Sequence, residues 1–465
     1  MTQNIYTILL FSLCAIILFY VCPKRYRAVA LVAESLVFYA VCDWKFAFLI
    51  ISETVVSWVL GRKKNKKSIL IGILFVLLIL AIFKYFNFFI DCFNLSFSHI
   101  LLPLGISYYS FKIISYLADV YYHKRESEPS LISYSVYILF FPHLICGPIV
   151  RSISITERIK AGVIFDTQRF YSGIVKIIYG LFMKTVIADR GGGYVSLVFT
   201  TPDDYPSLAL IFALCLYAIQ LYCDFAGYSL IAQGLTNCFG FDCISNFKRP
   251  YFASDIRDFW RRWHISLSSW LRDYIYIPLG GNRCSVLKKW INVLITFIAC
   301  GMWHGSNLPF IIWGTYHGIL NNLTPKKKNV GEVNGVIKRF LTLILVLFGW
   351  LLFRSESIPF ALHFITRVFT HFSLSYANIT ASVLPFTGDN TAIAYAITLF
   401  FMIALLFIKE LLDEKREISK GIVNSDDNSN SNVTQNYTLF WTSLFLILTV
   451  LFGIIGSSNF LYANF

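Results

Sequence analysis

Residues 290–317 read WINVLITFIACGMWHGSNLPFIIWGTYH. Two apolar runs, 290–302 and 309–317, flank the short stretch Trp303-His304-Gly305. An ionisable side chain inside membrane hydrocarbon is costly, so a histidine at this place indicates a functional site by default. A histidine also exchanges a proton near neutral pH, which suits general base catalysis. His304 is therefore the main candidate for a catalytic residue, and the alternative is a histidine that only hydrogen-bonds a neighbouring helix.

The composition predicts a membrane protein built from helices. The chain has 465 residues, of which 57% are hydrophobic and 14% are charged. Soluble domains carry roughly 45–50% apolar and about 25% charged residues. Apolar stretches recur along the whole length, and a backbone in lipid must satisfy its own hydrogen bonds. We expect an all-α, polytopic integral membrane protein with about 11–13 membrane segments.

The net charge of +14 follows the pattern of membrane loops. Basic residues gather in short loops between apolar runs, at 24–27, 62–67, 123–125 and 326–328. Such loops are typical of the cytoplasmic side of a membrane protein, and they leave no basic face of a soluble domain to bind nucleic acid. The eleven cysteines form no CxxC pair and no zinc-like spacing with histidine, so we predict no metal site.

A second unusual segment lies about forty residues before His304. Residues 257–266 contain three arginines, Arg257, Arg261 and Arg262, followed by Trp263 and His264. Aromatic and apolar positions from 260 to 274 recur at helical spacing, which predicts one helix at the cytoplasmic interface. The arginines fit two interpretations equally: anchors to anionic lipid, or a clamp for a phosphate-bearing donor such as coenzyme A.

Other polar residues are weaker candidates. Asp224 is a carboxylate in an apolar helix, so it must be paired or face a polar cavity, and it could orient a histidine or pair with an arginine. His317 is expected to be structural, or to support His304. His143 adjoins a helix break expected at Pro142. The remaining histidines, at 99, 123, 363 and 371, lie near segment ends and are expected to be solvated.

Several enzyme and transporter classes are disfavoured. The chain has no Gly-x-Ser-x-Gly, no P-loop and no HExxH motif.

A polar, low-complexity segment at 413–436 is expected to be a disordered linker. We divide the chain into N-terminal helices at 1–125, a catalytic core at 126–320, and C-terminal helices at 321–465.

Five motifs, read together, resemble the membrane-bound O-acyltransferase family. They lie at 141–151, 222–229, 258–268, 272–283 and 301–305, in order over about half of the chain. The resemblance is strongest to the bacterial branch that acetylates polysaccharides such as alginate. The turn Pro-Leu-Gly-Gly-Asn-Arg at 278–283 favours that branch over the sister branch, which transfers D-alanine to teichoic acid.

The resemblance implies a helical ring with a central tunnel, in a bacterial cytoplasmic (inner) membrane. It places the catalytic histidine at His304 and a second polar position at His264. Substrate and donor contacts are then expected at six residues: Arg257, Arg261, Arg262, Trp263, Trp303 and Asp224. The expected donor is a cytoplasmic thioester, acetyl-coenzyme A or an acyl carrier protein, and no bound cofactor is implied.

The resemblance also implies partners, namely a polysaccharide acceptor, membrane lipid and an esterase-like enzyme outside the membrane that receives the acyl group. Two alternatives remain open: D-alanyl transfer to teichoic acid, and a transporter or flippase without chemistry.

Overall fold

The computed structural model describes residues 4–145, 147–325, 332–370, 372–388, 391–422 and 430–454. Over these residues every regular element is a helix and there is no strand. The predicted all-α fold is therefore confirmed.

Twenty α-helices follow one another along the described chain. They are α1 (Ile5–Val21), α2 (Arg27–Asp43), α3 (Ala47–Arg62), α4 (Lys66–Phe93), α5 (Ile106–Tyr121), α6 (Leu131–Leu139), α7 (Pro142–Ile145), α8 (Ser152–Ala161), α9 (Thr167–Leu181), α10 (Asp189–Thr200), α11 (Ser207–Cys238), α12 (Ile256–Arg262), α13 (Ile265–Leu271), α14 (Val286–His304), α15 (Leu308–Leu323), α16 (Glu332–Arg354), α17 (Ile358–Thr370), α18 (Tyr376–Val383), α19 (Ala392–Ile422) and α20 (Asn430–Phe452).

By length and composition, eight helical stretches in the described chain can cross a membrane, and α1 and α17 are shorter apolar helices. One of the eight, Lys24–Arg62, contains both α2 and α3. The polytopic membrane architecture is thus confirmed, and the number of about 11–13 segments stays a prediction.

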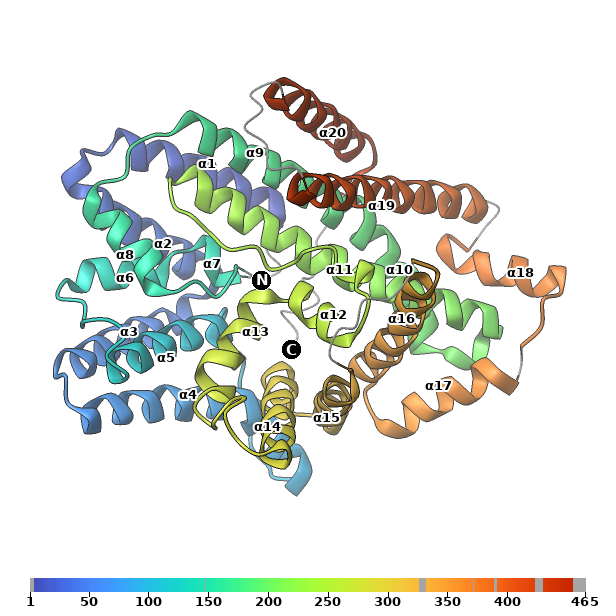
Figure 1. Cartoon of the computed structure of the whole chain (residues 1–465), viewed down its shortest axis with the longest axis horizontal. Coiled ribbons are helices and arrows are strands. Elements are labelled where there is room, and N and C mark those ends of the chain that lie inside the picture. The colour runs from blue at the N-terminus through green and yellow to red at the C-terminus, as the bar shows by residue number, and fades with distance from the viewer. Residues whose placement is uncertain are drawn as a thin grey trace.

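Figure 1 shows how the helices are arranged. The short helices α12 and α13 lie near the middle of the view, with α1–α6 on one side and α16–α18 on the other. Helices α14 and α15 lie below them, and α19 and α20 lie above. The central tunnel implied by the sequence stays a prediction.

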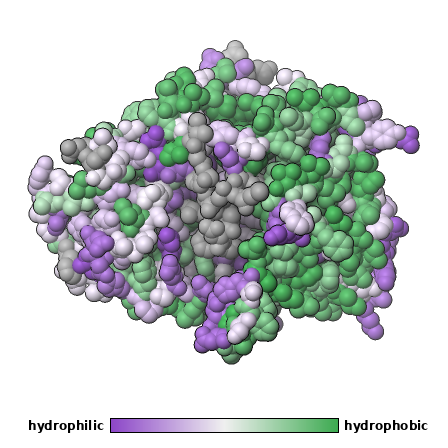
Figure 2. Space-filling model, turned by 180° about the vertical axis from the view of Figure 1, so that it is seen from behind, coloured by the Kyte–Doolittle hydropathy of each residue, from purple (hydrophilic) through white to green (hydrophobic). Residues whose placement is uncertain are grey.

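The outer surface of the N-terminal helices is apolar. Figure 2 shows hydrophobic side chains over the half of the molecule that holds these helices in Figure 1. Leu70, Ile71, Leu74 and Leu78 of α4 are all more than half exposed. Large apolar side chains that face outward in such numbers are expected where the surrounding solvent is lipid rather than water.

Helices α9 and α11 pack closely because glycines face each other. A Cβ atom at Gly180 would collide with the carbonyl of Gly227, and one at Gly227 would collide with the carbonyl of Gly180. Small residues at matching positions allow membrane helices to approach closely. A π-helical segment, Phe182–Ala188, then connects α9 to α10 and carries Lys184 toward α11.

The helical path is interrupted between α6 and α7. The predicted break at Pro142 is confirmed, since α6 ends at Leu139 and α7 begins at Pro142. The buried Lys112 of α5 donates to the carbonyl of Tyr137 in the last turn of α6. His143 hydrogen-bonds the hydroxyl of Thr236 at 2.9 Å. Hydrogen bonds from side chains therefore hold both the end of α6 and the start of α7 in place.

The polar linker is shorter than the predicted range of 413–436. Helix α19 runs to Ile422 and α20 begins at Asn430, so only 423–429, which lie outside the described residues, remain between them. The C-terminal part of α19 is held by ion pairs: Glu414 lies 2.7 Å from Arg249, and Glu417 lies 2.9 Å from Lys248. The sequence pattern missed these contacts because their partners are more than 150 residues away.

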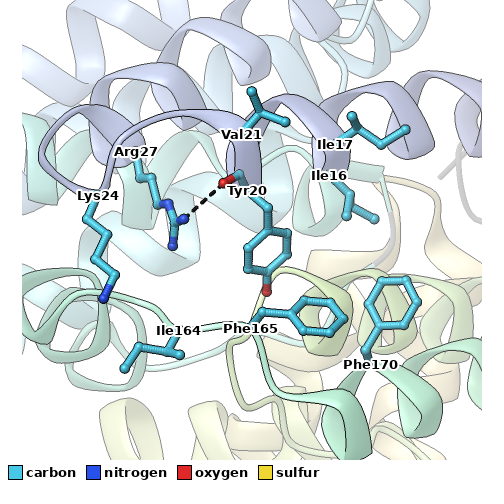
Figure 3. Close-up of a pocket in the computed structure, with 9 residues that line it drawn as sticks. All are labelled: Ile16, Ile17, Tyr20, Val21, Lys24, Arg27, Ile164, Phe165 and Phe170. Carbon is cyan, nitrogen blue, oxygen red and sulfur yellow. Dashed lines mark hydrogen bonds between the residues drawn. The ribbon is translucent and has the colours of Figure 1, made fainter.

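A groove of about 470 Å³ opens at the edge of the molecule (Figure 3). Helix α1 and the segment before α9 supply its apolar walls, and Lys24 and Arg27 are its cations. The Arg27 guanidinium donates to three backbone carbonyls, those of Tyr20, Cys22 and Val163. Arg27 thus holds the end of α1 against the 162–166 segment. None of the predicted site residues lines this groove.

Candidate active site

His304 is the last residue of α14, and close helix packing fixes its position. Helices α14 and α15 form a tight hairpin, in which a Cβ atom at Gly301 would collide with the carbonyl of Phe310. Gly305 leaves the helix in an extended conformation, with φ −170° and ψ 166°. The His304 side chain is consequently buried, with 3% of its surface exposed.

Aromatic rings enclose the His304 imidazole. Its ring centre lies 4.8 Å from that of Trp303, 5.2 Å from that of Trp313 and 5.2 Å from that of Phe353. These rings come from α14, α15 and α16. An enclosure of this kind excludes bulk water, which strengthens electrostatic interactions with any polar group that enters it.

His264 lies at a sharp turn between α12 and α13. Its backbone has φ 41° and ψ 54°, the left-handed region that residues other than glycine rarely adopt. The predicted single helix over 260–274 is therefore wrong, because the chain reverses direction locally at this residue. Asn246 stabilises the turn, since its carbonyl accepts from the amide of Ile265 at 2.9 Å. Strain of this type concentrates at functional sites.

The turn brings the two candidate histidines to the same tryptophan. The His264 ring centre lies 5.9 Å from that of Trp303. The Trp303 ring also contacts the ring of His304, the next residue in the chain. Phe225 of α11 packs edge-on against His264 at 4.6 Å. Three buried atoms have no hydrogen-bond partner among the described residues: the two ring nitrogens of His264 and the Nε1 of Trp303. Buried polar atoms without partners are rare, and here three lie on two rings that contact each other.

Trp263 and His317 pack against other aromatic side chains of the protein core. Trp263 packs against Phe259 at 5.6 Å and Trp350 at 4.7 Å, within a wholly aromatic cluster. The Trp260 indole donates to the Nδ1 of His317 at 3.4 Å. The structure thus places Trp263 in the aromatic core that supports the His264 turn.

The three arginines of the predicted clamp have different surroundings. Arg257 donates to the carbonyls of Asn321 and Asn322, at the end of α15. Arg262 pairs with Asp258 at 3.2 Å and with Glu414 at 3.1 Å. Arg261 is exposed and has no protein partner in the described chain. Of the three cations, Arg261 is therefore the one that is available to a phosphate.

Asp224 forms a buried ion pair with a lysine. The Lys184 ammonium lies 2.6 Å from Asp224 and 2.7 Å from Asp189, and both lysine and partners are almost fully buried. A buried charge needs such a partner, so this triad satisfies the requirement that the sequence posed.

The structure adds one residue that the sequence analysis missed. Lys84, in the apolar helix α4, has its ammonium 5.3 Å from the centre of the Trp303 ring. The next residue, Tyr85, donates to the carbonyl of Met302 at 2.7 Å and so ties α4 to the end of α14. The signal was present, because a lysine inside a long apolar run is as unusual as a histidine there.

The arrangement is suited to moving a proton onto and off an enclosed substrate. A histidine can accept a proton from an attacking hydroxyl, and nearby polar groups can bind the carbonyl that is attacked. No group of three or more metal-binding side chains gathers in the part of the chain that the structure describes.

Comparison with known proteins identifies the family of the chain. The sequence profile of the membrane-bound O-acyltransferase family matches residues 44–321, which include both histidines. The chain is 36% identical to the probable alginate O-acetylase of Pseudomonas syringae, over 83% of this chain and 78% of that protein. It is 30% identical to the peptidoglycan O-acetyltransferase of Helicobacter pylori, over 94% of this chain and 91% of that protein.

A third similarity is more limited in extent. The chain is 31% identical to the teichoic acid D-alanyltransferase of Bacillus subtilis, over 47% of this chain and 57% of that protein. The family profile covers more than half of the chain, and the relatives named acetylases align along most of it. The chain is therefore a multi-pass membrane enzyme, an O-acyltransferase that belongs to the membrane-bound O-acyltransferase family.

Proposed function

We propose that this enzyme takes an acetyl group from a thioester on the cytoplasmic side of the bacterial inner membrane and uses it to acetylate a cell-surface or exported polysaccharide. The observation that carries the proposal is the set of unpaired, buried polar atoms on His264 and on Trp303, the tryptophan whose ring contacts both His264 and His304. Polar atoms that are buried without partners are suited to hydrogen-bond a substrate.

The proposed reaction is a single acyl transfer. His304 accepts the proton of the acceptor hydroxyl while the hydroxyl oxygen attacks the thioester carbonyl. The carbon–oxygen bond forms, the carbon–sulfur bond breaks, and the proton passes from His304 to the departing thiolate. His264 or the Trp303 N–H holds the carbonyl oxygen as negative charge develops on it. Arg261 binds the phosphate of the donor, because its planar guanidinium matches phosphate geometry and has no protein partner.

The positions of basic residues at the helix ends support this sidedness. Helix α14 begins beside Lys288 and Lys289, and α4 begins at Lys66 after a basic turn, which indicates the cytoplasmic face for both. His304 lies eighteen residues into α14, about 27 Å from its start at 1.5 Å per residue. The hydrocarbon core is about 30 Å thick, so the reacting group is near the opposite face. The donor therefore reaches inward from the cytoplasm, and the acceptor approaches from outside.

The names of the relatives support acetyl over D-alanyl transfer. The relatives named alginate O-acetylase and peptidoglycan O-acetyltransferase align over most of the chain, whereas the D-alanyltransferase of Bacillus subtilis aligns over about half of it. We further propose that the hydroxyl acylated at His304 belongs to an esterase-like partner outside the membrane, which passes the acyl group on to a sugar hydroxyl of the polysaccharide.

The test uses sealed inverted membrane vesicles that contain the full chain, with the cytoplasmic face outward. Acetyl-coenzyme A with a labelled acetyl group is added outside, and base-labile label inside the vesicles is measured together with released thiol. The proposal predicts both signals, and predicts that a matched D-alanyl thioester gives neither. Label that appears only on the outer side, or D-alanine transfer at an equal rate, would refute it.

A further inference from the structure

The groove at the C-terminal end of α1 is open and has an apolar wall (Figure 3). Its volume of about 470 Å³ lies within the range of pockets that hold a small ligand, about 300–1,000 Å³. Side chains of α1 face side chains of the segment that leads into α9. Four of these apolar side chains are at least half exposed: Ile17, Val21, Ile164 and Phe165. The groove therefore leaves apolar surface free for an apolar ligand.

The polar group on this wall, the Tyr20 hydroxyl, is already hydrogen-bonded. It donates to the carbonyl of Cys238 at 3.0 Å, and the Tyr20 ring packs edge-on against Phe165 at 5.2 Å. The ring of Phe165 lies 5.3 Å from that of Phe170. A sugar or a nucleotide base against such a wall would bury polar groups without partners, which is costly. The wall is suited to a hydrocarbon chain.

Lys24 and Arg27 stand at the mouth of the groove, where Figure 3 shows both side chains extending from the turn between α1 and α2. In the described part of the chain neither cation forms an ion pair. Three of the five N–H groups of Arg27 donate to backbone carbonyls, which leaves two for a ligand. The nearby Asp166 instead caps α9, where it accepts from the amide of Arg169. Two cations without a carboxylate fit the oxygen atoms of a phosphate.

The order of these groups along α1 matches that of a phospholipid. The basic stretch 24–27 follows α1 and indicates the cytoplasmic side, where lipid headgroups lie. From Val21 back to Ile16 the apolar wall extends five residues along α1, about 7.5 Å into the hydrocarbon. The cations are therefore at the depth of the phosphates, and the apolar wall is at the depth of the acyl chains.

We propose that this groove binds an anionic phospholipid of the cytoplasmic leaflet, with an acyl chain along α1 and the phosphate between Lys24 and Arg27. The inference does not rest on the proposed reaction, because none of the candidate site residues lines the groove. The lipid bridges α1 and the segment before α9, the same two parts of the chain that Arg27 joins. A ligand that binds only the folded chain stabilises it, so the lipid stabilises this contact.

The test is photo-crosslinking of the full chain in nanodiscs of phosphatidylcholine. The probes are traces of phosphatidylglycerol or phosphatidylcholine that carry the same photoreactive acyl chain. Both have a phosphate, but the choline group balances the charge of the second. The measurement is the label on residues 16–21 and 164–170, by mass spectrometry of peptides. Phosphatidylglycerol is expected to label these residues at least about fivefold more than phosphatidylcholine does.

Two variants and a control locate the site. Lys24→Gln is expected to remove most of the preference for phosphatidylglycerol, whereas Arg25→Gln removes the same charge from the same turn and is expected to keep it, because Arg25 does not line the groove. Arg27 is left in place because it also holds the end of α1. Ile17→Trp fills the groove from an exposed helix position, so it is expected to reduce labelling of 164–170 by both lipids.

Three results would overturn the proposal. The first is equal labelling by the two lipids in the unaltered protein. The second is a preference that survives Lys24→Gln, or that Arg25→Gln removes equally. The third is loss of the phosphatidylglycerol label when acetyl-coenzyme A is added, which would assign the cations to a phosphate-bearing donor instead. Thioester cleavage in the same nanodiscs tests the proposed function separately.

Discussion

The rings of His264 and Trp303 meet edge to face, with centres 5.9 Å apart and planes inclined at 65°. This contact joins two segments that are about forty residues apart, the strained turn after α12 and the end of α14. It places a histidine with two unpaired nitrogens against the tryptophan that precedes His304. The account of catalysis given above depends on this arrangement.

Replacing His264 tests whether it acts as a neutral hydrogen-bonding group. His264→Asn keeps a donor and an acceptor, and it also tolerates the left-handed backbone conformation. We expect it to retain a substantial part of the transfer rate, whereas His264→Ala loses about 10²-fold or more. The measurement is acyl ester formation per mole of folded enzyme. Equal losses in the two variants would show that hydrogen bonding by residue 264 is not needed.

The same residue predicts how stability depends on pH. Burial lowers the pKa of His264 to about 3, from an ordinary value near 6.5. The unfolded chain gains a proton below about pH 6.5 that the folded chain does not, so acidification favours unfolding, by up to about 1.4 kcal/mol per pH unit. The stability that the folded protein has from keeping His264 neutral is fully present above pH 6.5 and is lost as the pH falls toward 3.

We therefore expect the thermal unfolding midpoint to decrease when the pH is lowered from 7 to 5. The decrease should be smaller in His264→Asn, because asparagine at position 264 does not titrate. Differential scanning fluorimetry of the full chain in detergent at the two pH values provides the comparison. A drop of the same size in both proteins would rule out this source of acid sensitivity.

The buried triad of Lys184, Asp224 and Asp189 predicts an order of destabilisation. Lys184→Met leaves two buried carboxylates without a cation, which costs about 3–5 kcal/mol. Asp224→Asn leaves Lys184 with Asp189 at 2.7 Å, so it is expected to cost clearly less. Unfolding midpoints of the two variants and of the double variant test this. The opposite order would mean that Asp224 is needed for a reason other than pairing with Lys184.

Arg261 and Arg262 are adjacent, but they are expected to affect different quantities. Arg261→Gln should raise the KM for the thioester donor several-fold and leave the unfolding midpoint unchanged, because Arg261 is exposed and has no protein partner in the described chain. Arg262→Gln removes the ion pairs to Asp258 and Glu414, so it should lower the midpoint instead. If Arg261→Gln leaves the KM unchanged, Arg261 does not bind the donor.

The sequence was sufficient to predict the helical membrane fold, the break at Pro142 and the two candidate histidines. These features depend on local properties: apolar length, proline geometry and the cost of a polar group in hydrocarbon. The sequence was insufficient where long-range pairing decides the outcome. The partner of Asp224 is forty residues away, and that of Arg262 is 152 residues away. The strained turn at His264 was hidden because the aromatic spacing on both sides continues the helical period.

The central claim is that His304 carries out acyl transfer. The most direct measurement is the acyl ester content of the cell-surface glycan, by analysis of the acid that base releases, in cells that make the unaltered chain or His304→Ala at matched membrane abundance. The account predicts that His304→Ala loses the ester while the protein remains folded in the membrane, and that the released acid is acetate. Ester content that is unchanged in His304→Ala would contradict it.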